Sequence, residues 1–297
     1  MVVFTGGECF LLKDELYKAI AFANSLGLIT RCVTNAFWGR TKKLADESVA
    51  KLIKAGISEI NISTGVDHQK WVTAKSVKRA ALTLINSKII TLITVEKDTE
   101  DSNCLNSFIN DSIFRKALNE NYQLFKIQSN SWMPFHADAE TRGDQSKHVN
   151  LKNGCGQLFN NTVVTPHNEL SACCGLTLEH IPEMKLGKLK NENLSDTYFS
   201  QFSDFLKIWI SVDGPLNIIE KVMGKDFVTN NLQMASHECQ VCAFLHKNEE
   251  VKRKLTAAYP AHVKIVLAQF GLKKVIEKDQ ERKLAKMERK EINYEKA

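Results

Sequence analysis

The fold of this chain is decided by its first residues, Val2-Val3-Phe4-Thr5-Gly6-Gly7-Glu8-Cys9-Phe10-Leu11. A short run of β-branched and aromatic residues stops at two glycines and a carboxylate, and a helical pattern follows from Lys13. This order predicts a strand, a tight turn and a helix. Glycine has no Cβ, so Gly6 and Gly7 let the backbone come close to a ligand. Glu8 is expected at the carboxyl end of a buried strand, where parallel α/β folds bind ligands. An ordinary strand-to-helix turn is the alternative.

The alternation of strand and helix patterns continues to residue 130. Apolar, β-branched runs predict strands, and apolar residues at helical spacing predict the helices between them. Such regular alternation is typical of a parallel sheet with right-handed crossovers. The strands are expected at 2–4, 29–34, 59–63, 89–95 and 124–128, and the helices at 13–26, 45–55, 76–86 and 111–119.

The texture changes after residue 130. Residues 131–154 are polar and predict a linker or long loop. Residues 155–245 are cysteine-rich and predict a smaller α+β region, and residues 246–297 predict helices that end in a charged one. Within these regions we expect a hairpin with an Asx-type turn at Pro166-His167-Asn168, and helix breaks at Asp213-Gly214-Pro215 and at Tyr259-Pro260.

Composition excludes several classes of protein. The chain has 297 residues, 43% of them hydrophobic and 25% charged, which is ordinary for a globular protein. No apolar run is long enough to span a membrane, and the start lacks the pattern of a signal peptide, so a cytoplasmic protein is predicted. Half of the net charge of +6 comes from residues 271–297, which mix nine basic with six acidic side chains. That mixture is typical of a solvated helix and not of a nucleic-acid site.

Eight cysteines form the strongest chemical signal, and five of them fall between residues 155 and 242. In a reducing compartment they are not expected to form disulfides. Cys239 and Cys242 make a CxxC, which would place two sulfurs on one side of a tight turn as half of a zinc or iron–sulfur site. Buried free cysteines with a chance CxxC are the alternative.

The other half of this site would come from Cys155 and one member of the pair Cys173-Cys174. The two neighbouring side chains point in different directions if they lie in a strand, so one of them is expected to bind. Cys174 is favoured weakly, because Gly175 after it leaves room for the backbone. Cys173 remains the alternative.

Polar residues also follow the predicted strands of the first region. Glu8, Asn35, Ser63 and Asp67 all stand at or just past the carboxyl end of a strand. Side chains there line the mouth of an α/β sheet. Each could instead be a cap or turn residue.

At this point the chain resembles the radical S-adenosylmethionine (SAM) enzymes. Phe4-Thr5-Gly6-Gly7-Glu8 is similar to their GGE motif, which closes the second strand of a partial (β/α)6 barrel and holds the amino group of SAM. Val33-Thr34-Asn35, the stretch from Ile60 to His68, and Phe125-Lys126-Ile127-Gln128 resemble later strands of that barrel. The resemblance implies an incomplete (β/α)6 partial TIM barrel over residues 1–130. It implies SAM binding by Gly6, Gly7, Glu8, Asn35, Ser63 and Asp67.

The cysteine-rich region resembles the SPASM or shorter twitch-type extension of the same family. The matching stretches are Cys155-Gly156, Val163 to Gly175, Leu186-Gly187-Lys188-Leu189 and Cys239-Gln240-Val241-Cys242. Such extensions carry an auxiliary [4Fe–4S] cluster. The resemblance implies cluster ligands at Cys155, Cys174, Cys239 and Cys242, with Cys173 as the alternative to Cys174.

One family motif is missing. The CxxxCxxC that holds the SAM-cleaving cluster precedes the GGE strand in the family, and it is absent here. We therefore expect an N-terminally truncated chain that does not cleave SAM by itself, with the radical SAM [4Fe–4S] cluster only in a full-length parent. By resemblance the parent would modify a peptide or small protein and take electrons from a flavodoxin or ferredoxin. The alternatives are a non-catalytic SAM- or peptide-binding member and a structural zinc-binding interaction protein.

Overall fold

The computed structural model describes residues 1–97, 104–131, 151–175, 178–190, 193–233, 235 and 237–294. These residues form two compact units, the first up to residue 131 and the second from residue 151. We call them unit 1 and unit 2 and describe each by itself. The predicted linker, residues 131–154, lies mostly outside the described residues.

Unit 1 contains a parallel sheet of five strands in the order β1-β2-β3-β4-β5. Every strand lies beside its neighbour in sequence, and right-handed crossovers that always advance in one direction place their helices on one face. This sheet confirms the predicted α/β class. The strands are β1 (Val2–Phe4), β2 (Thr30–Thr34), β3 (Glu59–Thr64), β4 (Ile90–Lys97) and β5 (Phe125–Ser131).

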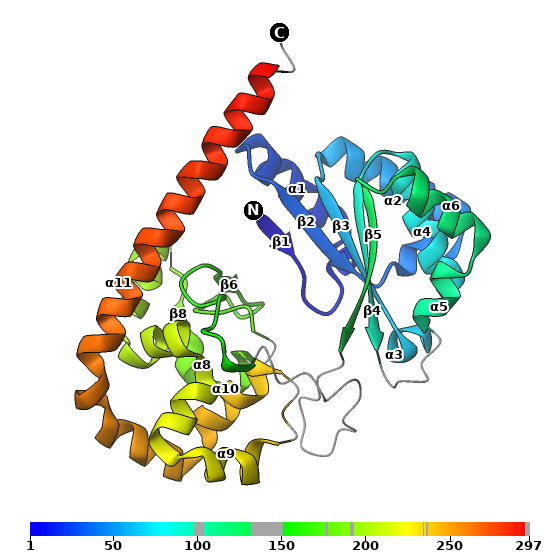
Figure 1. The fold of residues 1–297 in the computed structure, drawn as a ribbon. Coiled ribbons are helices and arrows are strands. Elements are labelled where there is room, and N and C mark those ends of the chain that lie inside the picture. The colour runs from blue at the N-terminus through cyan, green and yellow to red at the C-terminus, as the bar shows by residue number, and fades with distance from the viewer. Residues whose placement is uncertain are drawn as a thin grey trace. The chain divides into compact units, whose positions relative to one another are not determined.

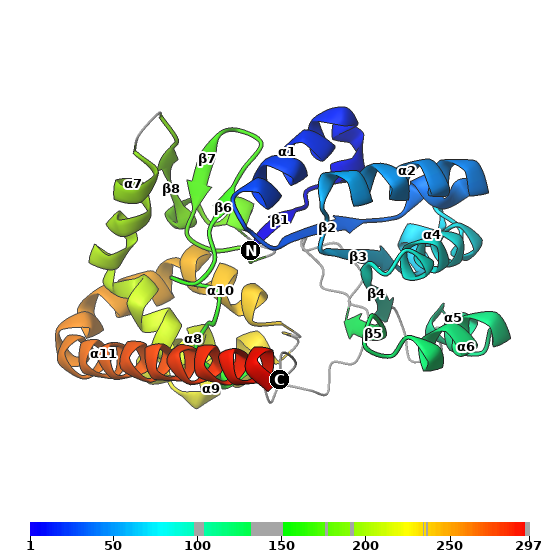
Figure 2. The same cartoon turned by 90° about the horizontal axis from the view of Figure 1, so that it is seen from above.

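Helices follow the strands where the apolar spacing predicted them. In Figures 1 and 2 the helices α1, α2, α4 and α6 lie along one side of the sheet, which bends into an arc. Thr41, Thr73 and Asp111 begin three of them as N-caps, because each side chain accepts a backbone N–H of the first turn. The elements are η1 (Cys9–Leu12), α1 (Asp14–Ser25), η2 (Phe37–Arg40), α2 (Lys42–Ala55), α3 (Val66–Gln69), α4 (Ala74–Asn86), α5 (Cys104–Ile109) and α6 (Ser112–Glu120).

The two faces of this sheet differ in character. Alternate residues such as Ile60, Ile62 and Ile93 are fully buried in the core that the helices cover. The residues between them, such as Asn61 and Thr94, are half-buried and polar, and the Thr94 hydroxyl donates to Asn61 Oδ1 at 3.1 Å. The period of two therefore divides the sheet into an apolar helix-covered face and a polar open face.

Unit 2 combines helices with a small antiparallel sheet in the order β6-β7-β8. Of the helices described here and in unit 1, none is both long and apolar enough to cross a membrane. The elements are β6 (Val163–Val164), β7 (Glu169–Ser171), η4 (Leu178–His180), η5 (Pro182–Met184), β8 (Lys185–Lys188), α7 (Leu194–Ser200), η6 (Gln201–Ser203), α8 (Phe205–Met223), α9 (Lys225–Leu232), α10 (Glu238–Lys247) and α11 (Glu249–Tyr294).

The predicted hairpin is present, with a different turn chemistry. Strands β6 and β7 pair antiparallel on either side of the turn. The Thr165 hydroxyl oxygen accepts the backbone N–H groups of His167 and Glu169, both at 3.3 Å. The Asn168 amide instead donates to the Leu189 carbonyl at 2.9 Å. Thr165 therefore closes the turn, and the prediction of an Asx-type turn was wrong.

The two predicted helix breaks have different outcomes. Gly214 leaves the helical conformation inside α8, with φ 77° and ψ 157°, so the break before Pro215 is confirmed. Pro260 lies inside α11, which remains helical on both sides, so the second predicted break was wrong. The ring of Tyr259 packs edge-on against Phe205, with 5.2 Å between centroids. Pro260 has no N–H, so one helical hydrogen bond is lost, and this loss predicted that the helix would end there. Tertiary packing keeps α11 helical through that position.

A close contact between η2 and α4 generates a stability prediction. A Cβ at Gly39 would overlap the Ser76 carbonyl and lie 2.9 Å from Ala80 Cβ. Gly39→Ala should lower the free energy of unfolding by about 1–3 kcal/mol, because the two elements must separate. Gly7→Ala is the matched control, since its Cβ would meet nothing within 4 Å. Urea denaturation measures both, and equal stability of the two variants would contradict the described packing.

Candidate functional site

Four cysteines line one cavity of about 30 Å³ in unit 2. They come from segments far apart in the sequence: the stretch before the hairpin, the end of β7 and the first turn of α10. Apolar side chains, among them Leu158 and Met184, complete the walls. Cysteines from separated segments thus line one partly open cavity. The four are Cys155, Cys173, Cys239 and Cys242.

The CxxC pair lies in a helix and not in the tight turn that the sequence suggested. Cys239 and Cys242 are three residues apart in the first turn of α10, so both side chains lie on one face. His237 caps this helix: its Nδ1 accepts the Cys239 N–H at 3.1 Å, and Gln240 Oε1 accepts the His237 N–H at 3.1 Å. Both cysteines therefore lie near the N-terminal, positive end of the α10 dipole.

The structure separates the two neighbouring cysteines after β7. Cys173 is buried and lines the cavity, whereas Cys174 is exposed and its sulfur lies 2.8 Å from Gln157 Oε1. An ideal Cβ on Gly175 would lie 3.5 Å from Cys173 Sγ and 3.2 Å from Cys239 Sγ. The glycine therefore gives room to these two sulfurs. The geometry favours Cys173, the alternative that the sequence left open, over Cys174.

The four cysteines have the chemistry of metal ligands, but their thiols are not grouped around one point. Four cysteines are the usual ligands of structural zinc and of [4Fe–4S] clusters. Among the described residues, no three His, Cys, Asp or Glu side chains are close enough to form a ready coordination sphere. Burial raises the pKa of the Cys155 thiol, that of Cys173 to about 11, and that of Cys242. A metal would therefore displace protons as it binds.

The position of Cys155 depends on the kink in α8. The Cys155 N–H donates to the Ile210 carbonyl at 2.9 Å. A Cβ on Gly154 would overlap the carbonyls of Ser211 and Val212, so only glycine lets the chain lie against the helix here. The backbone of α8 thus fixes the first cysteine of the set.

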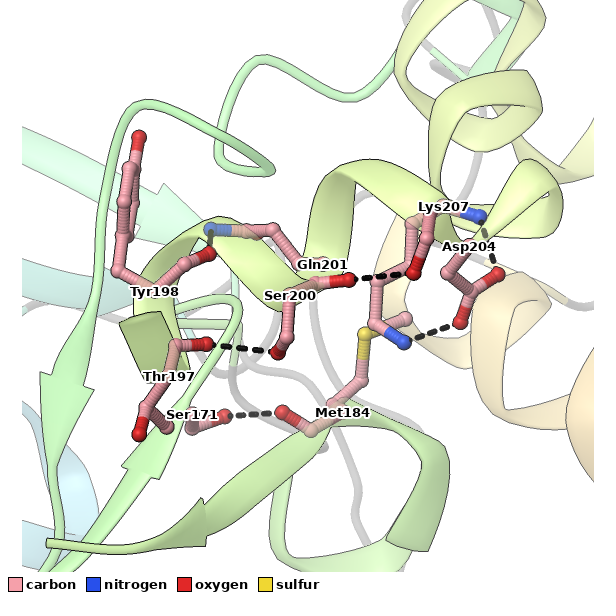
Figure 3. Close-up of polar contacts among 9 residues, drawn as sticks. Ser171, Met184, Thr197, Tyr198, Ser200, Gln201, Asp204 and Lys207 are labelled. Atoms are coloured by element: carbon pink, nitrogen blue, oxygen red, sulfur yellow. Dashed lines mark hydrogen bonds and ion pairs between the residues drawn. The ribbon is translucent and has the colours of Figure 1, made fainter. Parts of the chain in front are cut away.

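Buried polar residues also lie near the cysteine cavity, and no sequence motif predicted them. Lys207 is almost fully buried near the start of α8 and pairs with Asp204, as Figure 3 shows. His246 is buried as well; its Nδ1 lies 2.8 Å from the Cys242 carbonyl and 3.8 Å from Cys242 Sγ. Burial lowers the pKa of His246. A lysine and a histidine inside amphipathic helices give no signal before the packing is known.

In unit 1, Glu8 joins the ends of two strands. Its carboxylate accepts the N–H of Phe10 at 3.1 Å, the N–H of Asn35 at 2.8 Å and the Thr34 hydroxyl at 2.9 Å. The Asn35 side chain accepts the N–H of Phe37 at 2.9 Å, which closes an Asx turn. Both predicted ligand residues therefore act as caps in the described structure.

The remaining predicted residues lie along the same edge of the sheet. Ser63 is at the carboxyl end of β3, and Asp67 follows in α3, where it pairs with Lys70 at 2.6 Å. Gly6 has φ 119°, which requires glycine, whereas Gly7 has no such constraint. All six residues for which the resemblance implied SAM binding therefore lie at or after the carboxyl ends of β1, β2 and β3.

Sequence reasoning missed a histidine–carboxylate pair at this edge. His68 Nδ1 lies 2.9 Å from Glu96 Oε2, which joins α3 to the end of β4. A Cβ on Gly65 would lie 2.7 Å from Glu96 Cβ, so the glycine makes room for this pair. In the sequence, this pair could have been inferred only from the glycine at position 65 and from the expected closeness of strands β3 and β4.

Comparison with known proteins adds no assignment. No family model matches the chain, and no curated protein matches it.

The contacts of Glu8 generate a prediction that needs no ligand. Glu8→Gln replaces an anion that receives three hydrogen bonds, so unfolding should become easier by about 1–3 kcal/mol. Glu15→Gln is the matched control, because Glu15 is 72% exposed in a surface pair with Lys18 and its loss should not be measurable. Thermal or urea unfolding of both variants measures the difference. Equal stability of Glu8→Gln and the wild type would refute the role of Glu8 in joining the ends of the two strands.

The two adjacent cysteines allow a direct test of the cavity. If the cavity binds a metal, Cys173→Ser should lose it, because Cys173 lines the cavity with the other three cysteines. Cys174→Ser should retain the wild-type metal content, because its sulfur points to Gln157 and solvent. Metal analysis of both proteins after anaerobic purification measures this. The reverse pattern would restore Cys174 as the ligand.

Proposed function

We propose that this protein is an iron–sulfur protein of the radical SAM class whose unit 2 holds an auxiliary [4Fe–4S] cluster. The single observation that carries the proposal is the convergence of four cysteines on one cavity. Cys155, Cys173, Cys239 and Cys242 would supply the thiolates. A bound cluster of this kind supplies an electron-transfer or ligand-binding centre. The apolar walls would exclude water from the sulfurs, and the α10 N-terminus would favour their negative charge.

Unit 1 supports the same proposal through its topology. A sequentially ordered parallel sheet with helices on one face is the arrangement that a partial (β/α)6 barrel needs. Its polar open face and carboxyl edge would receive SAM. Glu8 accepts three protein donors, and a carboxylate has about four acceptor positions, which leaves one for an ammonium group. SAM should raise the melting temperature of the wild type and do so less in Gly7→Ala.

The proposed substrate is a peptide or small protein, and a flavodoxin or ferredoxin would donate electrons to an active form. No residue of this chain is assigned to SAM cleavage, because its cysteines contain no CxxxCxxC spacing. A member of the class that binds SAM or a peptide without catalysis would keep the same two sites.

A structural zinc site is the second candidate. Four cysteines from separated segments are also the donor set of zinc, and the capped CxxC on α10 would serve either metal. In that case the protein would be an interaction module whose metal ties together the hairpin, the segment before it and α10.

Metal analysis decides between the candidates. We expect about four irons and four acid-labile sulfides per chain after anaerobic purification or cluster reconstitution. Cys242→Ala should lower both, since it removes one of the four thiols at the cavity. About one zinc with no sulfide would replace the iron–sulfur proposal by the zinc one. Neither metal in the wild type would overturn both.

A further inference from the structure

We propose that Lys273 of α11 is a positioning residue for the four-cysteine centre. It holds the kinked backbone of α8 beside Cys155 and places a positive charge on the Cys155 side of the centre. The inference rests on the metal centre proposed above and names the residue that balances its charge.

The first support is the hydrogen-bond requirement of the kink. Pro215 has no N–H, so the Ser211 carbonyl loses the donor that an unbroken helix would provide. Lys273 Nζ donates to this oxygen at 2.6 Å. A helix 62 residues further along the chain thus satisfies the carbonyl that the proline leaves without a partner.

The second support is the closeness of this carbonyl to the first cysteine. A Cβ on Gly154 would overlap the Ser211 carbonyl oxygen, so the backbone directly before Cys155 lies against the oxygen that Lys273 holds. The Cys155 N–H in turn binds the carbonyl of Ile210, one residue earlier in α8. The Lys273 ammonium group, the kink of α8 and the backbone at Cys155 therefore lie next to one another.

The third support is the charge balance around the cavity. Four thiolates with a zinc ion or a [4Fe–4S] cluster carry net negative charge, which is costly to bury without a cation. Lys207 is also near, but its ammonium group already pairs with Asp204 (Figure 3). Within the described residues Lys273 has no ion pair with an acid. It is therefore a cation that can balance the centre, while Glu238 at the cavity wall adds negative charge.

Cobalt(II) titration of the metal-free protein under anaerobic conditions tests this role. The thiolate-to-cobalt absorption band reports binding, whichever metal the protein holds naturally. Lys273→Gln keeps a hydrogen-bond donor but removes the charge, and we expect it to weaken cobalt binding about tenfold, the usual cost of a lost partner near a metal site. Lys273→Arg should restore affinity close to wild type. Lys278→Gln, at an exposed position of the same helix, should leave it unchanged.

Each result has one meaning. Equal cobalt affinity of wild type, Lys273→Gln and Lys278→Gln would overturn the role of Lys273 while leaving the metal centre intact. Failure of the wild type to show any thiolate–cobalt band would instead overturn the metal centre. Circular dichroism of the metal-free variants separates an effect on folding from an effect of charge. If Lys273→Gln is unfolded and Lys273→Arg binds cobalt no better than Lys273→Gln, the positioning role is overturned and Lys273 is a purely structural contact.

Discussion

The backbone carbonyls at the kink of α8 impose the constraint on which the architecture of unit 2 depends. A helix that breaks at Gly214-Pro215 leaves carbonyl groups without helical donors, and a buried group without a partner costs about 1–3 kcal/mol. Two donors come from elsewhere in the chain, the Cys155 N–H and the Lys273 ammonium group. A third, the Asn217 amide, lies within α8 and donates to the Asp213 carbonyl. One interruption of a helix therefore ties the start of unit 2 to its last helix.

Unit 1 solves a similar problem with a side chain. The turn after β1 leaves the N–H of Phe10 without a helical partner, and the end of β2 does the same for Asn35; the Glu8 carboxylate accepts both. The residue that resembles a SAM ligand thus also holds β1 to β2. A structural role does not remove a binding role, because the same carboxylate is fixed at the edge where parallel sheets bind ligands. It does mean that loss of binding in a Glu8 variant has to be separated from loss of stability.

Local patterns predicted what local forces decide. The strands of unit 1 followed from β-branched runs, its helices from apolar spacing, and the α8 break from a glycine beside a proline. The choice between Cys173 and Cys174 could not be predicted, because it depends on how the chain after β7 packs against Gly175 and Cys239. The continuity of α11 through Pro260 could not be predicted for the same reason, since rings from α8 hold Tyr259. Charge near the cavity was equally hidden, because Lys273 stands in an ordinary amphipathic helix.

The core of unit 2 determines how a metal would act on it. Trp209, Ile218 and Ile219 are buried in an apolar cluster that extends well beyond the cavity, and Trp209 stacks on His262 with 4.6 Å between rings. Small zinc modules lack such a core and unfold without metal. Here the helices have their own apolar contacts, and the thiols at the cavity are held by backbone hydrogen bonds and glycines. A metal would therefore add stability that grows with the logarithm of its concentration over its dissociation constant, and its loss would leave a folded unit with protonated cysteines. That separation is what allows single cysteines to be exchanged and the metal content to be interpreted as binding.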